Sequence, residues 1–350
     1  MVAARSTTRG VVMVDVAKRA GVSQKTVSRV VNNAPYVRPD VRDKVNAAIE
    51  ELGYRPNVAA RALASQRTHT IGMLVVGASL SGPARRLFSV DQAARKHGYT
   101  IALATVPDLR PDSVAEGVES LLSRGIEGLV IEIPNHLATF DVTALADLPV
   151  ITSAGRIAGL ARQTVVDVDQ ASSARAATAY LLGLGHRTVF HIAGPRDWDA
   201  AEKRQHGWRS ALQEAGAHVP RVLFGDWTAR TGYRLGRRLA DRPEVTAIFV
   251  ANDHMAMGVL RAMAEAGRRV PDNVSVFGYD DVPEAEFQMV PLSTIAIDAA
   301  EAAERILSEL VAMIEGADPA EEPIELSCRM VLRSSTGPPA HGRPPPPTGS

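Results

Sequence analysis

The stretch from Val14 to Asn32 reads VDVAKRAGVSQKTVSRVVN and predicts two short helices separated by a tight turn. Apolar residues recur at helical spacing from Met13 to Ala20, and Gly21 ends this first helix. Ser23 is a good N-cap for the second helix, because its hydroxyl can accept a hydrogen bond from a free backbone N–H. Two short helices joined in this way are typical of a helix-turn-helix.

The outer face of the second helix carries side chains suited to reading DNA. Gln24, Lys25, Ser28 and Arg29 lie opposite an inner face of valines. Glutamine and arginine can make paired hydrogen bonds to adenine and guanine edges in the major groove, while hydroxyl groups can bind phosphates. Any one of these residues alone would equally fit a small helical bundle with a solvated polar face. Their joint placement favours a DNA-binding function.

The charge distribution supports a polyanion-binding head. The 350 residues hold 39 basic and 39 acidic side chains, but residues 1–69 alone carry twelve Lys and Arg against five Asp and Glu. The head therefore has a net charge of +7 and the rest of the chain −7. A third helix is predicted after Pro39, ending at Gly53, and it completes the head.

Residues 14–23 and 26–32 resemble the head of LacI-type transcription regulators. The resemblance implies that Gln24, Lys25 and Arg29 read bases. It also implies contacts to the DNA backbone from a second set of residues: Ser23, Thr26, Ser28, Asn32 and Tyr36. One departure is Arg38-Pro39, where many members carry a small hydroxyl cap.

The linker that follows reads PNVAARALAS over residues 56–65. Its alanines favour helix, but it is shorter than the roughly 12–15 residues that an isolated helix needs in water. The resemblance implies a hinge helix that orders on the operator. Leu63 would wedge into the minor groove, and Asn57 and Arg61 would support it along the backbone. The alternative is an alanine-rich linker in which Leu63 packs on the body.

From residue 70 onward, short apolar runs alternate with amphipathic stretches, which predicts parallel sheets covered by helices on both faces. The expected strands are residues 71–76, 100–106, 129–133, 149–152, 165–168, 189–193, 222–224, 247–250, 274–277 and 292–297. The expected helices include residues 84–96, 171–184, 202–214, 231–240 and 254–265. So many strands exceed a usual single sheet, and two α/β lobes are expected.

The predicted fold is an N-terminal all-α helix-turn-helix head joined to an α/β two-lobed body with parallel sheets. The expected divisions are a DNA-binding head at 11–56, a hinge at 57–69, and an effector-binding and dimerisation body at 70–334. Lobe 1 is expected at about 70–168 and 298–326, and lobe 2 at about 169–297 and 327–334. Residues 335–350 are expected to form a disordered, proline-rich tail.

Polar residues directly after apolar strands mark a candidate ligand site. Asn252, Asp280 and Trp227 follow three of the expected strands. Ligands of parallel α/β sheets bind outside the carboxyl ends of the strands. Amides and carboxylates can bind hydroxyl groups, and an indole face can stack on a pyranose, so an uncharged sugar fits. The alternative is that Asn252 and Asp280 are ordinary turn residues, which are common in loops, and that Trp227 is a structural core residue.

The resemblance covers nearly the whole chain, to about Arg333, and implies a periplasmic-binding-protein-like body with the effector between the lobes. Arg204 falls on the effector-binding arginine, and Asn252 and Asp280 fall on hydrogen-bonding positions. Trp227 matches the stacking tryptophan of the lactose-binding member.

There are three departures from the resembled pattern. Ala154-Gly155-Arg156 replaces an acid that many members carry before an arginine, and Asp298-Ala299 replaces an acid followed by an aromatic residue. The C-terminal leucine heptads of tetrameric members are missing, so a homodimer is expected.

Other function classes have little support in the sequence. A single cysteine, Cys328, excludes an intrachain disulfide and a zinc site of several thiolates. We find no secretory signal, no transmembrane stretch and no nucleotide-binding, metalloprotease or serine-hydrolase motif, and we expect no cofactor, metal or catalytic residue.

The expected function is a cytoplasmic, nucleoid-associated regulator, most simply a repressor. It would bind a pseudo-palindromic operator and be released by a sugar. One alternative is the same DNA-binding role with a purine or sugar-phosphate effector, or with an activator output. The more remote alternatives are a solute-binding protein and an α/β enzyme, each with a fused head.

Overall fold

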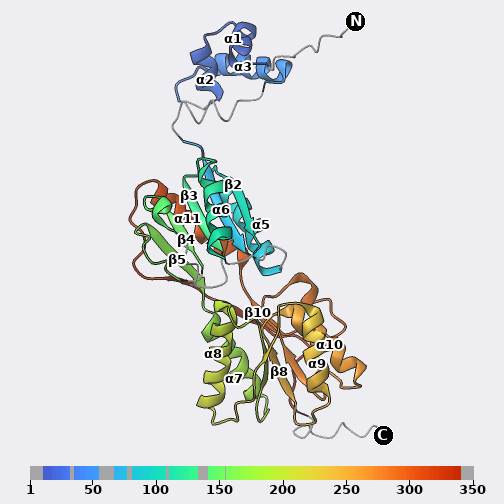
Figure 1. Cartoon of the computed structure of the whole chain (residues 1–350). Coiled ribbons are helices and arrows are strands. Elements are labelled where there is room, and N and C mark those ends of the chain that lie inside the picture. The colour runs from blue at the N-terminus through green and yellow to red at the C-terminus, as the bar shows by residue number, and fades with distance from the viewer. Residues whose placement is uncertain are drawn as a thin grey trace, which may run out of the picture. The chain divides into compact units, whose positions relative to one another are not determined.

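The computed structural model describes residues 11–31, 35–54, 67–76, 81–107, 110–132, 141–153 and 155–339. The chain divides into two compact units, one ending at Thr68 and one beginning at His69 (Figure 1). We call the first unit the head and the second the body, and describe each separately. Among the described residues, no helix is both long enough and apolar enough to cross a membrane.

The head is a three-helix unit, as the sequence predicts. Its helices are α1 (Met13–Ala20), α2 (Gln24–Val31) and α3 (Pro39–Leu52). Gly21 has a φ of 67°, a left-handed conformation that glycine adopts without strain, and this turns the chain from α1 into α2. Val16, Val27 and Val45 are fully buried, one from each helix. The three helices therefore share one small apolar core.

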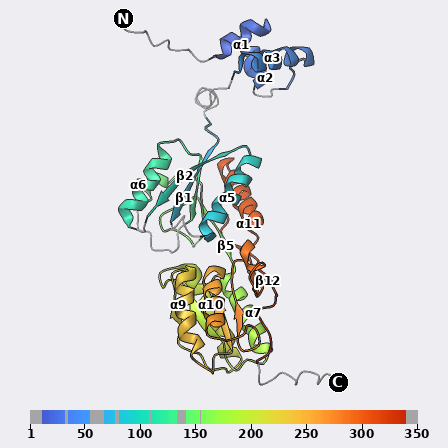
Figure 2. The same ribbon diagram turned by 90° about the vertical axis from the view of Figure 1, so that its right-hand side faces the viewer.

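Lobe 1 of the body is built on a six-stranded parallel sheet in the order β11-β5-β4-β3-β1-β2. The strands are β1 (Thr70–Val76), β2 (Thr100–Val106), β3 (Gly128–Glu132), β4 (Val150–Thr152), β5 (Gln163–Val168) and β11 (Ile324–Leu326). The helices are α5 (Ser81–Lys96), α6 (Pro111–Leu122) and α11 (Ala299–Ile314), with a 3₁₀ turn at Thr143–Leu145. Figure 2 shows α6 on one face of the sheet and α5 with α11 on the other. Separate apolar clusters fill the two faces.

Lobe 2 is built on a four-stranded parallel sheet in the order β7-β6-β8-β9. The strands are β6 (Phe190–Ala193), β7 (Leu223–Phe224), β8 (Ala247–Val250) and β9 (Ser275–Phe277). The helices are α7 (Gln170–Gly183), α8 (Asp199–Glu214), α9 (Ala229–Ala240) and α10 (Asp253–Glu265), with a 3₁₀ turn at Pro283–Ala285. Helices α7 and α8 cover one face, and α9 and α10 cover the other (Figure 1). The prediction of two α/β lobes is therefore confirmed.

The chain passes between the lobes three times. It enters lobe 2 after β5, returns to lobe 1 between β10 (Thr294–Ala296) and α11, and re-enters lobe 2 between β11 and β12 (Arg329–Val331). Strands β10 and β12 pair with each other in antiparallel fashion. The strand expected at 292–297 is therefore present but shorter. Single parallel bridges join it to the end of β9, whereas its antiparallel partner β12 is a short strand that the apolar pattern did not indicate.

The boundary expected for the disordered tail is also wrong. Ser335 is fully buried, its hydroxyl donates to the Val276 carbonyl at 2.6 Å, and the Ser293 N–H donates to its Oγ at 2.8 Å. The Val276 N–H in turn donates to the Ser335 carbonyl at 2.9 Å. Residues 335–339 therefore belong to lobe 2, while residues 340–350 lie outside the described part of the chain.

Candidate functional site

Helix α2 presents one polar face to solvent. Its start is capped by Ser23, whose Oγ accepts from the Thr26 N–H at 3.1 Å and lies 2.9 Å from the Thr26 hydroxyl. Gln24, Lys25 and Arg29 are exposed. Neither Lys25 nor Arg29 forms an ion pair with any carboxylate in the described part of the head. These three side chains are free to meet a ligand.

Of the other residues that the sequence singles out in the head and hinge, three lie within the described residues and four lie outside them. Thr26 and Ser28 are half-buried on α2. Tyr36 is 95% exposed and has a φ of 67°, which is unusual for a residue with a side chain. The remaining four lie outside the described residues: Asn32, Asn57, Arg61 and Leu63. The expected hinge helix is therefore not part of the described structure.

A contact between α1 and α3 ties these two helices of the head together. Arg19 on α1 donates to Glu51 on α3 through Nε at 2.9 Å, and its Nη2 lies 2.5 Å from the second carboxylate oxygen. A two-point contact of this kind holds the orientation of both side chains. Helix α2 is held against the same two helices by the buried Val27 and Val30.

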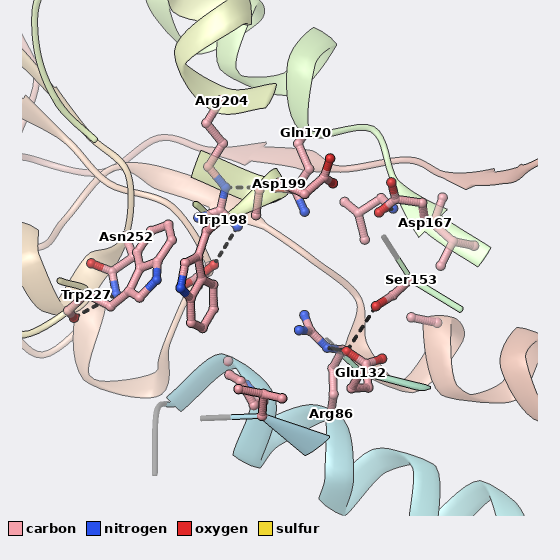
Figure 3. Close-up of a pocket in the computed structure, with 18 of the residues that line it drawn as sticks. Arg86, Glu132, Ser153, Asp167, Gln170, Trp198, Asp199, Arg204, Trp227 and Asn252 are labelled. Carbon is pink, nitrogen blue, oxygen red and sulfur yellow. Dashed lines mark hydrogen bonds and ion pairs between the residues drawn. The ribbon is translucent and has the colours of Figure 1, made fainter. Parts of the chain in front are cut away.

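A cavity of about 410 Å³ opens between the two lobes of the body, and all four residues expected to bind an effector line it. Arg204, Trp227, Asn252 and Asp280 come from lobe 2, three of them just beyond the carboxyl ends of β7, β8 and β9. Lobe 1 contributes its own polar residues to the wall: Arg86, Glu132, Ser153 and Asp167 (Figure 3). The cavity thus joins segments that are far apart in the sequence.

Arg204 is the most firmly held side chain of this cavity. Its Nε donates to Gln170 Oε1 at 2.7 Å, its Nη1 donates to the Ala251 carbonyl, and its Nη2 lies 3.4 Å from Asp280 Oδ1. The guanidinium also lies over the ring of Tyr279, 3.6 Å from the ring centre. A group fixed on several sides offers a ligand a donor that is already oriented.

Asn252 and Trp227 are linked to each other. The Asn252 Oδ1 accepts from the Met255 N–H at 3.0 Å, which caps α10, and its Nδ2 donates to the Trp227 carbonyl at 3.1 Å. Trp227 has a left-handed φ of 70° and packs within the apolar cluster of lobe 2. Gly194 makes room for the indole, because a Cβ there would lie 2.2 Å from the ring. Trp227 is therefore both a residue of the lobe 2 core and a residue of the cavity wall.

Asp253 follows the wall residue Asn252 in the sequence but does not itself line the cavity. It is fully buried, and its two carboxylate oxygens accept from the Thr294 hydroxyl at 2.7 Å and the Val282 N–H at 2.9 Å. Burial, together with the negative charge of Asp280, raises the pKa of Asp253 to about 8.

The cations around the cavity are already paired with carboxylates. Arg86 Nε lies 2.8 Å from Glu132 Oε2, and Arg204 pairs with Asp280. Lys203 Nζ lies 2.5 Å from Asp167 Oδ2 and 2.8 Å from Asp199 Oδ2, and its pair with Asp167 joins lobe 2 to lobe 1. An anionic ligand would therefore have to compete with carboxylates for every one of these cations.

Sequence reasoning missed several residues of this wall. Trp198 precedes α8 and its ring meets that of Trp227 edge-on, with centroids 5.5 Å apart. Glu132 and Asp167 lie inside the strands that the sequence predicts at 129–133 and 165–168, whereas Glu132 is the last residue of β3. The rule that ligands bind at the carboxyl ends of strands would have found Glu132 had that strand end been placed correctly.

Comparison with known proteins gives a consistent result. The model of the family described as "Bacterial regulatory proteins, lacI family" matches residues 12–57, and that described as "Periplasmic binding protein-like domain" matches residues 178–336. The transcriptional regulator CelR of Thermobifida fusca is 35% identical, over 80% of this chain and 85% of its own length. The lactose operon repressor of Escherichia coli is 32% identical, over 82% of this chain and 80% of its own.

Solved structures show the same similarity. A lac repressor dimer bound to operator and an anti-inducer has a TM-score of 0.82 at 29% identity, covering 94% of this chain and 100% of that one. A complex of the regulator CelR with cellobiose has a TM-score of 0.66 at 31% identity, covering 93% of this chain and 99% of that one.

Proposed function

The chain belongs to the LacI family of DNA-binding transcription regulators, and from this membership we propose that it is a sugar-responsive repressor that acts as a dimer. The observation that carries the proposal is the inter-lobe cavity, where Arg204, Asp280, Asn252 and Trp227 come together. Carboxylate, amide and guanidinium groups beside an indole offer hydrogen bonds and an apolar face to a pyranose. A ligand bound between the lobes favours one lobe arrangement over another, so effector and operator affinities are coupled.

An uncharged sugar fits this cavity better than a phosphorylated or other anionic effector. Arg86, Lys203 and Arg204 each face a carboxylate partner within 3.4 Å. A phosphate would have to separate one of these pairs and leave a carboxylate uncompensated in a partly enclosed space. Among the relatives, a CelR structure contains cellobiose, a neutral sugar.

The head is the proposed operator-binding module. Gln24, Lys25 and Arg29 read base edges in the major groove, and two copies of the head read two half-sites of a pseudo-palindrome. The nearby hydroxyl groups of Ser23, Thr26 and Ser28 contact phosphates. Asn32 and Tyr36 also contact the DNA backbone. Asn57, Arg61 and Leu63 act at the centre of the operator, where Leu63 enters the minor groove.

Exposed apolar side chains on the body support a dimer. Among the described residues, Phe88 is 65% exposed, Phe287 81% and Met289 103%. Phe287 and Met289 lie two residues apart, and large apolar side chains exposed side by side mark interaction surfaces. One relative of known structure is a lac repressor dimer on its operator. We place this protein in the bacterial cytoplasm, at the DNA of the nucleoid.

The test of this function has two parts. Selection from random DNA by the purified full-length protein should recover a pseudo-palindrome. Thermal unfolding should then be measured with neutral sugars, sugar phosphates and purines, where a ligand at a hundredfold its Kd adds about 2.7 kcal/mol. Stabilisation and operator release by a neutral sugar support the proposal. Stabilisation only by a phosphate or purine would contradict the sugar assignment and leave the operator function standing.

A further inference from the structure

The inter-lobe cavity has two aromatic walls rather than one. Trp198 and Trp227 both line it, and their rings meet edge-on at 5.5 Å between centroids. Because the planes are inclined by 64°, the two rings turn their faces in different directions. Trp227 is 8% exposed and packs in the apolar cluster of lobe 2, whereas Trp198 is half-buried at the edge of that cluster. One pyranose can stack on one of these faces only.

The cavity also has two polar ends. The lobe 2 end holds Arg204, Asn252 and Asp280. At the lobe 1 end the carboxylate of Glu132 accepts from Arg86 Nε at 2.8 Å and from the Ser153 hydroxyl at 3.3 Å. Figure 3 shows Trp198 between Trp227 with Asn252 on one side and the group of Arg86, Glu132 and Ser153 on the other.

Each end contains a buried polar atom that has no hydrogen-bond partner among the described residues. Glu132 is 4% exposed, yet its Oε1 is buried and accepts no hydrogen bond from any described residue. The same holds for Trp227 Nε1, which finds no acceptor among the described residues. Buried polar atoms are nearly always hydrogen-bonded, so unsatisfied atoms on two residues that line a cavity point to a ligand. Glu132 Oε1 needs a donor and Trp227 Nε1 an acceptor, and a hydroxyl group can be either.

We propose that the effector is an uncharged saccharide of two rings, which binds one ring at Trp227, Arg204, Asn252 and Asp280 and the second between Trp198 and the Glu132–Arg86–Ser153 group of lobe 1. This inference rests on the proposed sugar-responsive function and specifies its ligand. Trp198 selects for the second ring by stacking, and Glu132 selects for a hydroxyl on that ring. A ligand held by both lobes also explains how binding changes the lobe arrangement, because the second ring stacks on Trp198 of lobe 2 and bonds to Glu132 of lobe 1.

The experiment compares two-ring and one-ring sugars on the full-length protein by titration calorimetry. The probes are cellobiose, lactose and maltose, with glucose and galactose as their component rings. At least one disaccharide should bind about tenfold or more tightly than its component rings, since one further hydrogen bond with an apolar contact is worth about 1.4 kcal/mol. Trp198→Ala should lower the affinity for that disaccharide by about tenfold and leave monosaccharide affinity within about twofold.

Three further variants separate binding from folding. Trp198→Phe keeps an aromatic face and should retain most of the disaccharide affinity, while Ser153→Ala and Glu132→Gln should weaken only the disaccharide. If Trp198→Ala does not fold, Ser153→Ala carries the comparison, because it removes only one hydroxyl.

The outcomes distinguish this inference from the proposed function. Equal affinity for one-ring and two-ring sugars would overturn the inference and leave the sugar-responsive function intact. Equal loss of both sugar types in Trp198→Ala would also overturn it. If no probe sugar binds the wild-type protein, the sugar assignment itself fails, and the two-ring inference fails with it.

Discussion

Arg204 Nη2 lies 3.4 Å from Asp280 Oδ1, and the arginine approaches the carboxylate from α8 while Asp280 follows β9. Both side chains border the inter-lobe cavity, and Asp280 also has a left-handed φ of 107°. The pair therefore links two segments of lobe 2 at the point where a ligand would bind. Four contacts hold Arg204, so its loss affects both the cavity and the surrounding structure.

We expect Arg204→Ala to abolish the response to sugar while operator binding without sugar remains. Loss of the guanidinium removes an oriented donor from the cavity and leaves Asp280 without its partner, which costs about 1.5–3 kcal/mol of stability for a hydrogen bond to a charged group. Operator gel shifts with and without sugar, together with thermal unfolding, measure the two effects. Arg204→Met combined with Asp280→Asn should recover part of the stability but not the response. A single variant that releases operator normally would remove Arg204 from the effector site.

Replacing Lys25 or Arg29 by alanine should weaken operator binding by about 1–3 kcal/mol and relax base preference at the contacted positions. The fold of the head should be unaffected, because both side chains are exposed and α2 is held by Val27 and Val30. Lys44→Ala is the matched control: it removes an equal charge from the exposed part of α3. If this control relaxes base preference as much as Arg29→Ala does, α2 is not the reading helix.

The contribution of Asp253 to the stability of the body should fall as the pH rises from 3.8, the ordinary pKa of an aspartate, toward about 8, the pKa of Asp253 in the fold. In this window the folded Asp253 holds a proton that the unfolded chain releases, so unfolding becomes more favourable with rising pH. Asp253→Asn should flatten that dependence, since the amide is uncharged and still offers one acceptor to Thr294 or Val282. Denaturant unfolding of both proteins across the window measures the slopes. Identical slopes would mean that Asp253 ionises normally in the fold.

Met289→Asp should convert the dimer to a monomer, because the charge would be buried in an apolar interface. Operator affinity should fall sharply, since one head would read only one half-site, while sugar binding should persist because the cavity lies within a single chain. Sedimentation velocity and sugar titration of the same preparation measure both properties. Met289→Leu, which keeps an apolar side chain, serves as the control. A dimeric Met289→Asp protein would place the subunit interface elsewhere.

The head was the part of the fold most open to sequence reasoning. Gly21, Ser23 and the buried valines act within a few residues of one another, and local spacing reveals them. In the body, the apolar strands and the residues after β7, β8 and β9 were likewise visible. The strands near the end of the chain were not, because β12 has three residues and pairs with β10 more than thirty residues earlier.

The sequence predicts only part of the candidate site, because the rest depends on contacts between distant segments. The sequence indicates Arg204, Trp227, Asn252 and Asp280, but it does not indicate Trp198 or Glu132. Trp198 contributes through its approach to Trp227, and Glu132 through its neighbours Arg86 and Ser153. Such groupings depend on tertiary contacts between segments that no local pattern relates to one another.

The three passages of the chain between the lobes bear on how the protein is made. The head and the four-stranded sheet of lobe 2 are each encoded by one continuous segment, so each can form soon after it leaves the ribosome. Lobe 1 cannot do so, because α11 and β11 arrive only after the whole lobe 2 sheet has been synthesised. The first five strands of lobe 1 must therefore wait, with one apolar face covered by α5 but not yet by α11, while the rest of the chain is translated. During this interval the nascent chain would be most vulnerable to aggregation and most dependent on chaperones.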